Sequence, residues 1–202
     1  MQLIKQDNII IPDIVSALKQ GQTIVYPTET CYGLGCDATN EQAVNKIFEI
    51  KRRQRKKPLL VVVSEPFVIM NYTSWNKTLQ QLSEKYWPGA LTVVVPVSDK
   101  VCLPPGVVGE DGTLAFRITA HPLASQLSHG LGKPIVSTSA NITTLGSPYD
   151  IESVLDMFVN AEFRPDIIID AGSLPHRSPS TVVRVVNGDI EVLRQGETVV
   201  EL

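Results

Sequence analysis

Residues 59–63, Leu-Leu-Val-Val-Val, form the feature that most restricts how this chain can fold. The run has the length and the β-branched residues of a strand, and it offers no polar side chain for a face in contact with water. A strand of this kind is buried on both faces, so other elements must cover its sheet from both sides. Residues 91–97 repeat the pattern, and Pro96 within them predicts an edge position or a bulge.

The rest of the sequence predicts further strands and helices around these two runs. A helix is expected to start at the Thr39-Asn40-Glu41-Gln42 capping box and to stop before Pro58, which cannot continue it. The stretch after Pro27 is predicted to be rich in turns, and residues 98–112 to be a long loop. Other predicted strands are residues 23–27, 113–118, 134–138 and 166–170 and a hairpin of 181–186 with 190–194, and other predicted helices are 65–71, 76–87, 121–130 and 150–160. We therefore expect an α/β protein with one mixed, twisted sheet and flanking helices, formed by a single domain over residues 1–202.

Positive charge is concentrated in residues 51–57, Lys-Arg-Arg-Gln-Arg-Lys-Lys, which place six cations in seven positions. The whole chain has 18 Lys and Arg against 21 Asp and Glu, so the remainder is acidic. A general nucleic-acid binder spreads its cations over a broad face, and this distribution favours a local anion site instead. The segment straddles the expected end of a helix, where one or two cations compensate the helix dipole and six exceed that need. Charge alone leaves both phosphate binding and a solvated helix end open.

The sequence lacks the motifs of several common kinds of functional site. Cys31, Cys36 and Cys102 show no Cys-x-x-Cys spacing and the three histidines are scattered, so no metal site is predicted and the thiols are expected to be buried or inert. The sequence contains neither a G-x-x-x-x-G-K-[ST] phosphate loop nor a G-x-S-x-G nucleophile elbow. No apolar run is long enough for a signal peptide or a membrane helix, which predicts a soluble, cytoplasmic protein without membrane association.

Polar clusters stand where predicted strands begin or end. Residues 28–30 follow the first strand, residues 137–141 follow another, and residues 178–181 precede a third. Open α/β sheets bind ligands at strand ends, so these hydroxyls and amides could orient a small polar substrate while Arg117, Arg194 and the basic segment hold its anionic parts. Turn formation is the alternative role of each cluster, since Ser, Thr and Asn are common in turns.

Five motifs, taken together, are similar to one known family. They are YPTETCYGLG (26–35), K-x-R-x-x-x-K with PLLVVV (51–63), YWPGALTVVV (86–95), STSAN (137–141) and PSTVVRV (179–185), in this order through nearly the whole chain. In this combination they resemble the YrdC family of threonylcarbamoyl-AMP synthases. The resemblance implies an α/β fold around a positively charged cavity, in the short single-domain form of the family.

The resemblance also implies an activity. The family joins L-threonine, bicarbonate and ATP, the last as its Mg²⁺ complex, into threonylcarbamoyl-adenylate and releases pyrophosphate. The product is the donor for threonylcarbamoyladenosine in tRNA, and partner proteins carry out the transfer. No nucleophile, acid or base stands out among the residues, so catalysis is expected to come from positioning and charge stabilisation.

Residue by residue, the resemblance implies two groups of contacts. Residues expected to bind ATP are Lys51, Arg53, Lys57, Thr113, Ser139, Asn141, Ser147 and Arg194. Residues expected to bind threonine are Thr28, Thr30, Arg117, Ser137 and Ser180, with Arg117 on the carboxylate. The chain departs from the family at Arg52, where many members have glycine or another small or polar residue, at Gln54, where many have proline, and at Val62, where some longer members have a threonine-binding histidine.

Two other functions remain open on the sequence alone. The basic segment could bind double-stranded RNA in the same cavity, although the acidic remainder and the lack of an aromatic stacking row argue against it. The chain could also make a carbamoyl-adenylate for another acceptor, as in hydrogenase maturation proteins. The absence of acylphosphatase-like and zinc-finger segments argues against that reading.

Overall fold

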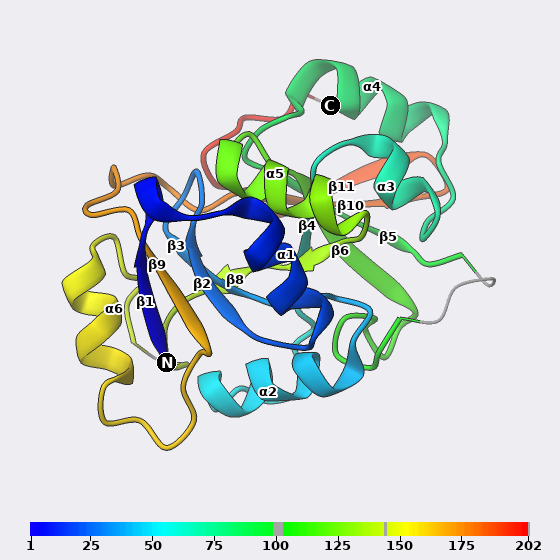
Figure 1. Cartoon of the computed structure of the whole chain (residues 1–202). Helices are drawn as coiled ribbons and strands as arrows, with labels where there is room; N and C mark the ends of the chain where they lie inside the picture. Colours follow the sequence, from blue (N-terminus) through cyan, green and yellow to red (C-terminus); the bar gives the residue numbers. More distant parts are fainter. Residues whose placement is uncertain (99–102, 144, 202) are drawn as a thin grey trace.

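The computed structural model describes residues 1–98, 103–143 and 145–201, and within them the strands form two sheets (Figure 1). One sheet has five strands in the order β1-β9-β2-β3-β8, and the other has six in the order β11-β10-β5-β6-β4-β7. The strands are β1 (Gln2–Lys5), β2 (Ile24–Pro27), β3 (Tyr32–Gly35), β4 (Val61–Val63), β5 (Leu91–Pro96), β6 (Thr113–Ile118), β7 (Ile135–Val136), β8 (Thr138–Ser139), β9 (Ile167–Asp170), β10 (Thr181–Val186) and β11 (Asp189–Arg194). The helices are α1 (Ile11–Lys19), α2 (Glu41–Lys51), α3 (Pro66–Met70), α4 (Lys77–Tyr86), α5 (Pro122–Leu131) and α6 (Ile151–Phe158), with a short 3-10 turn, η1 (Gln6–Asn8).

The predicted α/β fold is confirmed, but its strands divide between two sheets instead of forming one. The division falls within residues 134–138, which the sequence predicts as a single strand. β7 pairs with β4 in the six-stranded sheet and β8 pairs with β3 in the five-stranded sheet, so the chain passes from one sheet to the other at Ser137. An apolar pattern predicts that a strand exists but does not show which strand it pairs with. The sequence therefore gives no sign that the chain changes sheets at Ser137.

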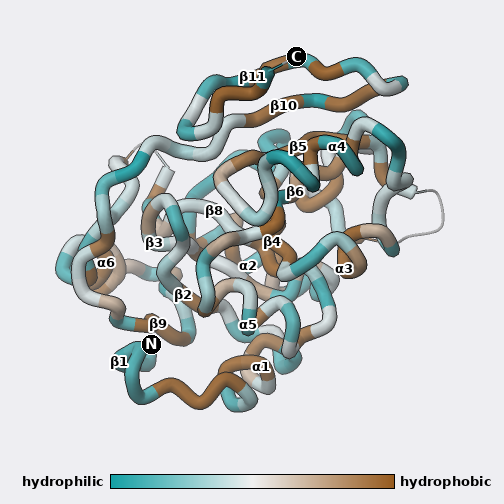
Figure 2. The backbone as a smooth tube through the Cα atoms, turned by 90° about the horizontal axis from the view of Figure 1, so that it is seen from above, coloured by the Kyte–Doolittle hydropathy of each residue, from teal (hydrophilic) through white to brown (hydrophobic). Residues whose placement is uncertain are grey.

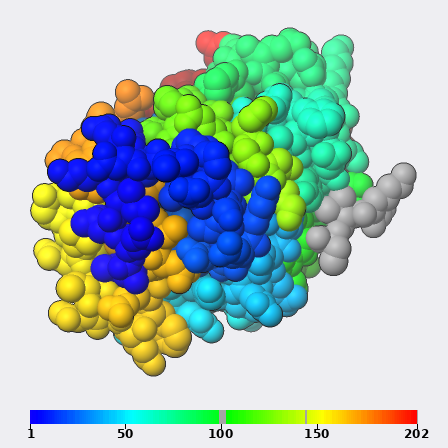
Figure 3. Space-filling model, viewed as in Figure 1, coloured from blue at the N-terminus to red at the C-terminus, as the bar shows by residue number. Residues whose placement is uncertain are grey.

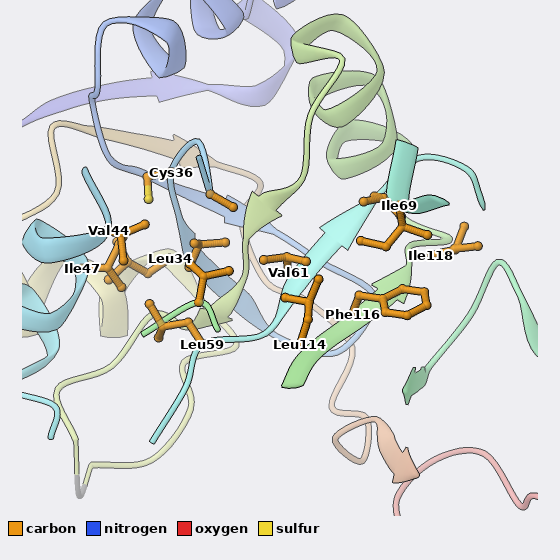
Figure 4. Close-up of a cluster of buried hydrophobic side chains, with 14 of the residues drawn as sticks. Leu34, Cys36, Val44, Ile47, Leu59, Val61, Ile69, Leu114, Phe116 and Ile118 are labelled. Carbon is orange, nitrogen blue, oxygen red and sulfur yellow. The ribbon is translucent and has the colours of Figure 1, made fainter. Parts of the chain in front are cut away.

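Strand β4 is buried on both faces, as its apolar sequence predicts. Val62 packs in a hydrophobic cluster with α1 and α5, which lie side by side in Figure 1. Its neighbours Val61 and Val63 point the other way, into a larger cluster that includes α2. Figure 4 shows part of this larger cluster, where Leu34 of β3 lies between Ile47 of α2 and Val61. The alternation along one strand supplies both hydrophobic clusters of the fold.

Two local predictions are wrong, each for a physical reason. β5 lies inside its sheet, between β10 and β6, although it contains a proline. Pro96 is the last residue of β5, and the parallel pairing with β10 has already ended at Val94, so the missing N–H interrupts no bond on that side. Residues 32–35 form β3 instead of turns. Its Gly35 permits a close approach between strands, since a Cβ there would lie 2.2 Å from the carbonyl oxygen of Val136.

The N-terminal part of the chain completes the five-stranded sheet. β1 pairs in parallel with β9, and Figure 3 shows the N-terminal residues lying across that region, next to α6. The hairpin of β10 and β11 lies on the opposite side of the molecule from β1 and α1 (Figure 2). Among the described residues, no helix combines the length and the apolar character needed to cross a membrane.

Helix α2 ends inside the basic segment. Asn40 caps its N-terminus by accepting a hydrogen bond from the Ala43 N–H (3.0 Å), and Lys51 is its last residue. Arg52 follows with φ 49° and ψ 42°, the left-handed region that favours glycine. The departure from the family at position 52 therefore places a side chain where the backbone is strained.

Replacing Arg52 with glycine is expected to raise the free energy of unfolding by about 0.5–1 kcal/mol, because relief of left-handed strain outweighs the entropy that glycine gains in the unfolded chain. Arg52→Val should lower it. Urea unfolding of the variants checks the order, with Lys56→Gly as the control, since Lys56 is exposed and is not among the residues with a positive φ. An Arg52→Gly protein no more stable than the wild type would contradict the strain at this position.

Candidate active site

A cavity of about 450 Å³ is lined by residues from both sheets. β3 and β8 contribute from the five-stranded sheet, and β5, β6, β10 and β11 contribute from the six-stranded one. The turn after β2 and the segment between α2 and β4 complete the walls, together with residues 147–149 and 177–180. Four arginines line the cavity, namely Arg53, Arg117, Arg177 and Arg194. Within the described part of the chain no Asp or Glu belongs to the lining, which makes the cavity suitable for anions.

The fold gathers most of the predicted site residues around this cavity. Those that line it are Thr28, Thr30, Arg53, Arg117, Ser137, Ser139, Ser147, Ser180 and Arg194. Those outside the lining are Lys51, Lys57, Thr113 and Asn141. Lys51 and Asn141 are buried directly behind Ser139, whereas Lys57 is exposed and Thr113 donates its hydroxyl hydrogen bond to Asp111 (2.7 Å).

Thr28 shapes the turn that follows β2. Its hydroxyl donates to the carbonyl oxygen of Cys31 (2.7 Å) and accepts from the N–H of Thr30 (3.2 Å). The hydroxyls of Thr28 and Thr30 lie 3.2 Å apart. Because the turn uses most of the bonding capacity of Thr28, the hydroxyl of Thr30 is better placed to meet a ligand.

Arg117 offers a buried guanidinium to the cavity. Its residue is 3% exposed, and its Nε lies 3.5 Å from Oε1 of Glu29. Among the described residues, no hydrogen bond joins the guanidinium to the protein. A buried arginine with open terminal donors is suited to a carboxylate, which can accept two parallel N–H bonds from it.

Ser180 and Arg194 form a second polar group in the cavity lining. Arg194 donates from Nη2 and Nε to the carbonyl oxygen of Ser180 (2.7 and 3.2 Å). The hydroxyl of Ser180 lies 2.9 Å from that of Thr92. Burial and the charge of Arg117 lower the pKa of Arg194 from its ordinary value, which is so high that the guanidinium stays charged. The contacts hold this charge at the cavity wall.

Lys51, the first cation of the basic segment, is buried and bonded to the turn that contains Ser139. Its Nζ donates to the carbonyl oxygens of Ser139 (2.5 Å) and Asn141 (2.7 Å) and to Oδ1 of Asn141 (3.1 Å). These three acceptors use all three donors of an ammonium group. Asn141 in turn donates to the carbonyl oxygen of Leu145, two residues before Ser147. Lys51 thus fixes the backbone at Ser139 and Asn141.

Burial shifts the acid–base equilibrium of Lys51 strongly. It lowers the pKa of Lys51 to about 7, and the positive charge of Arg53 acts in the same direction. The group therefore titrates near neutral pH.

The other cations of the segment have separate environments. Arg53 donates from Nε to the carbonyl oxygen of Lys57 (2.9 Å) and from Nη2 to that of Pro58 (3.1 Å), which holds its guanidinium in the cavity lining. Arg55 bonds Oδ1 of Asn45 (2.6 Å), on the exposed side of α2. Arg52, Lys56 and Lys57 are also exposed. One arginine and one buried lysine of the segment are thus directed toward the site, and four cations face water.

Sequence reasoning missed several residues of the site. Tyr149 and Arg177 line the cavity from two separate segments without regular structure, where no strand or helix pattern marks them. Cys31 also lines it, although the thiols are predicted to be inert; Cys36 is buried as predicted, and Cys102 lies outside the described residues. Val62 faces the cluster of α1 and α5, so the departure from the family at this position lies outside the lining.

No metal cluster is found in the described part of the chain, where no three His, Cys, Asp or Glu side chains come together.

Comparison with known proteins gives consistent matches over most of the chain. Residues 16–196 match the model of the Sua5, YciO and YrdC family, whose description is "Telomere recombination". The threonylcarbamoyl-AMP synthase of Aliivibrio fischeri is 34% identical over 91% of this chain and 97% of its own length. The enzyme of the same name from Yersinia pestis is 35% identical over 95% of this chain and 98% of its own length.

Solved structures show the same fold. Sua5 of P. abyssi complexed with L-threonine has a TM-score of 0.85 and 30% identity, and this chain spans 57% of its length. YciO of E. coli has a TM-score of 0.81 and 25% identity over 96% of this chain and 94% of its own. A nucleotide-bound HypF has a TM-score of 0.79 at 20% identity, which shows a shared fold alone, and this chain covers 29% of it.

The lowered pKa of Lys51 predicts how stability should depend on pH. The unfolded chain binds a proton that folded Lys51 has lost between about pH 7 and the ordinary lysine range, so the contribution of Lys51 to the free energy of unfolding should rise with pH there. Denaturant unfolding of the wild type and Lys51→Met from about pH 7 to about pH 9.5 measures this as a growing difference. Lys56→Met, which removes an exposed ammonium, is the control and should give a flat difference. A flat or falling difference for Lys51→Met would show that its ammonium persists at high pH.

Proposed function

Because the chain belongs to the family of Sua5, YciO and YrdC proteins, we propose that it is a nucleotidyltransferase that joins L-threonine, bicarbonate and ATP into threonylcarbamoyl-adenylate and releases pyrophosphate. The observation that carries the proposal is the cavity, which combines hydroxyls suited to a small amino acid with four arginines suited to a carboxylate and phosphates. Two relatives named threonylcarbamoyl-AMP synthase, which this chain matches over almost their full length, support it.

Threonine would bind on the side of Arg117 and the turn after β2. The terminal nitrogens of Arg117 suit the carboxylate of the amino acid, because a guanidinium can donate two parallel hydrogen bonds to it. Thr30, Ser137 and Ser180 line the same cavity and can pair with the amine and the hydroxyl. Thr28 would act by shaping the turn that presents Thr30.

ATP would bind along the wall that carries Arg53 and Arg194. Both guanidiniums line the cavity and are fixed by backbone carbonyl oxygens, so they present charge to phosphates without further ordering. Ser139 and Ser147 line the cavity as well, and Lys51 fixes the backbone at Ser139 and Asn141 from behind the lining. Lys57 and Thr113 remain predicted ATP contacts, and each side chain would have to turn toward the cavity when the nucleotide binds.

The chemistry we propose needs no protein nucleophile. The amine of threonine and bicarbonate combine into a carbamate with loss of water, and a carbamate oxygen then attacks the α-phosphorus of ATP as pyrophosphate leaves. The protein contributes by aligning the two substrates and by stabilising the charge on the phosphates. Mg²⁺ would arrive bound to ATP, because the described lining supplies arginines and hydroxyls and no carboxylates of the kind that bind Mg²⁺.

The product would serve tRNA modification. Threonylcarbamoyl-adenylate is an activated donor, and proteins that transfer its threonylcarbamoyl group to tRNA would be the partners of this enzyme. Such a role favours the cytoplasm as its compartment. The comparisons do not favour the alternative of an RNA-binding module, because the relatives that cover the whole chain are named as synthases.

A direct assay tests the proposal. Pure protein incubated with labelled threonine, bicarbonate and Mg-ATP should form the adenylate and release pyrophosphate. Valine lacks the hydroxyl and should support far less pyrophosphate release, because it would leave buried polar groups of the pocket unpaired. Equal turnover with valine would contradict the threonine pocket, and absence of any adenylate would contradict the proposed reaction.

The two kinds of cation in the basic segment should differ in this assay. Arg53→Ala is expected to weaken ATP or transition-state binding by about 1.5–3 kcal/mol, the scale of a lost hydrogen bond to a charged group. Lys56→Ala, which removes an exposed cation of the same segment, should cost less than about 1 kcal/mol, and added salt should reduce that loss further. Comparing kcat/KM for ATP checks both. Equal losses would indicate that the segment acts only through its overall charge.

A further inference from the structure

Glu29 lies between two cavity residues but points away from the cavity. Thr28 and Thr30 line the cavity, and Glu29 does not. Its side chain is 10% exposed and turns toward the residues that follow β6. Neither the substrate contacts nor the chemistry described above gives this buried carboxylate a role.

Both carboxylate oxygens of Glu29 are engaged by the end of β6. Oε2 accepts a hydrogen bond from the hydroxyl of Thr119 (2.9 Å), and Oε1 accepts one from the N–H of Ala120 (3.3 Å). Oε1 also lies 3.5 Å from Nε of Arg117. Since β2 and β6 belong to different sheets, Glu29 joins the two sheets beside the cavity.

The contact with Arg117 concerns one edge of its guanidinium. Glu29 lies at Nε, so the terminal nitrogens stay available on the cavity side. A buried guanidinium is costly without a nearby negative charge, and the Glu29 carboxylate supplies one from behind the lining. The same carboxylate anchors the turn that carries Thr30. One side chain thus sets the relative position of two groups that come from different sheets.

We propose that Glu29 is a positioning residue, which holds Arg117 and Thr30 in the relative geometry that selects the amino-acid substrate. This inference rests on the proposed function. Glu29 acts through Arg117 and the turn, and it takes no proton from the substrate, because its two oxygens are occupied and lie outside the lining. Replacing Glu29 should therefore weaken the binding of threonine and leave the binding of ATP unchanged.

The test measures binding of threonine and of a non-hydrolysable ATP analogue by calorimetry, after synthesis of the adenylate has been assayed in the wild type. Glu29→Gln keeps the shape of the side chain but removes its charge and places an amide against Arg117. We expect the Kd for threonine to rise about tenfold or more, because the buried guanidinium of Arg117 loses the negative charge beside its Nε, and the Kd for the ATP analogue to stay within about twofold. Glu65→Gln is the matched control, because Glu65 pairs with His129 at the surface (3.4 Å) and should change neither affinity.

A double-mutant comparison shows whether Glu29 acts through Arg117. In an Arg117→Lys background, which already lacks the guanidinium, Glu29→Gln should weaken threonine binding much less than it does alone. Independent, multiplying effects in the double variant would overturn the inference, and so would equal losses of threonine and ATP-analogue binding. If Glu29→Gln does not fold, Glu29→Asp decides the matter. It keeps the charge on a shorter side chain and should raise the Kd for threonine at least about threefold with the ATP analogue unaffected.

The outcomes separate this inference from the proposed function. A wild type that makes adenylate, together with a Glu29→Gln protein that binds threonine normally, would overturn only the positioning role. A wild type that makes no adenylate and binds no threonine would overturn both.

Discussion

Complete burial of β4 is the constraint on which the rest of the structure depends. Its three valines alternate between two hydrophobic clusters, one with α1 and α5 and one with α2. The middle of such a strand has no face left for polar chemistry. Most of the side chains that line the cavity consequently lie near strand ends and in the turns beside them, and Arg117 reaches it from within β6. The cavity lies beside the two hydrophobic clusters, which fill the space around the middle of β4.

The parts of the fold that follow from local pattern were predictable from the sequence. The strand at 113–118, the Asn187-Gly188 turn between β10 and β11, and the apolar runs all appear where expected, because β-branched residues and turn residues act over a few positions. The division into two sheets was not predictable, since it depends on which distant strands pair. β3 was not predicted because its Gly35 serves close packing against Val136, and glycine in a sequence usually indicates a turn.

Residues of the candidate site that belong to a sequence motif could be predicted. Residues that only the fold brings to the cavity could not. Nine of the residues implied by the family resemblance line one cavity although they are spread from 28 to 194, and no periodicity could have joined them. Tyr149 and Arg177 were not predicted because each belongs to a segment without regular structure. In the sequence, the six cations of the basic segment could not be told apart by their surroundings. In three dimensions Lys51 is buried, Arg53 lines the cavity and Arg55 lies over the ring of Phe48, so equal charges have unequal surroundings.

The order of the strands in the two sheets determines when each sheet can be completed as the chain is synthesised. A ribosome releases the chain from its N-terminus, and the five-stranded sheet cannot close around β2 until β9 has emerged, because β9 lies between β1 and β2. Arg194 emerges later still, on the strand that forms the edge of the other sheet. The lining of the cavity can therefore be completed only after residue 194 has left the ribosome, although most of the lining residues are synthesised much earlier.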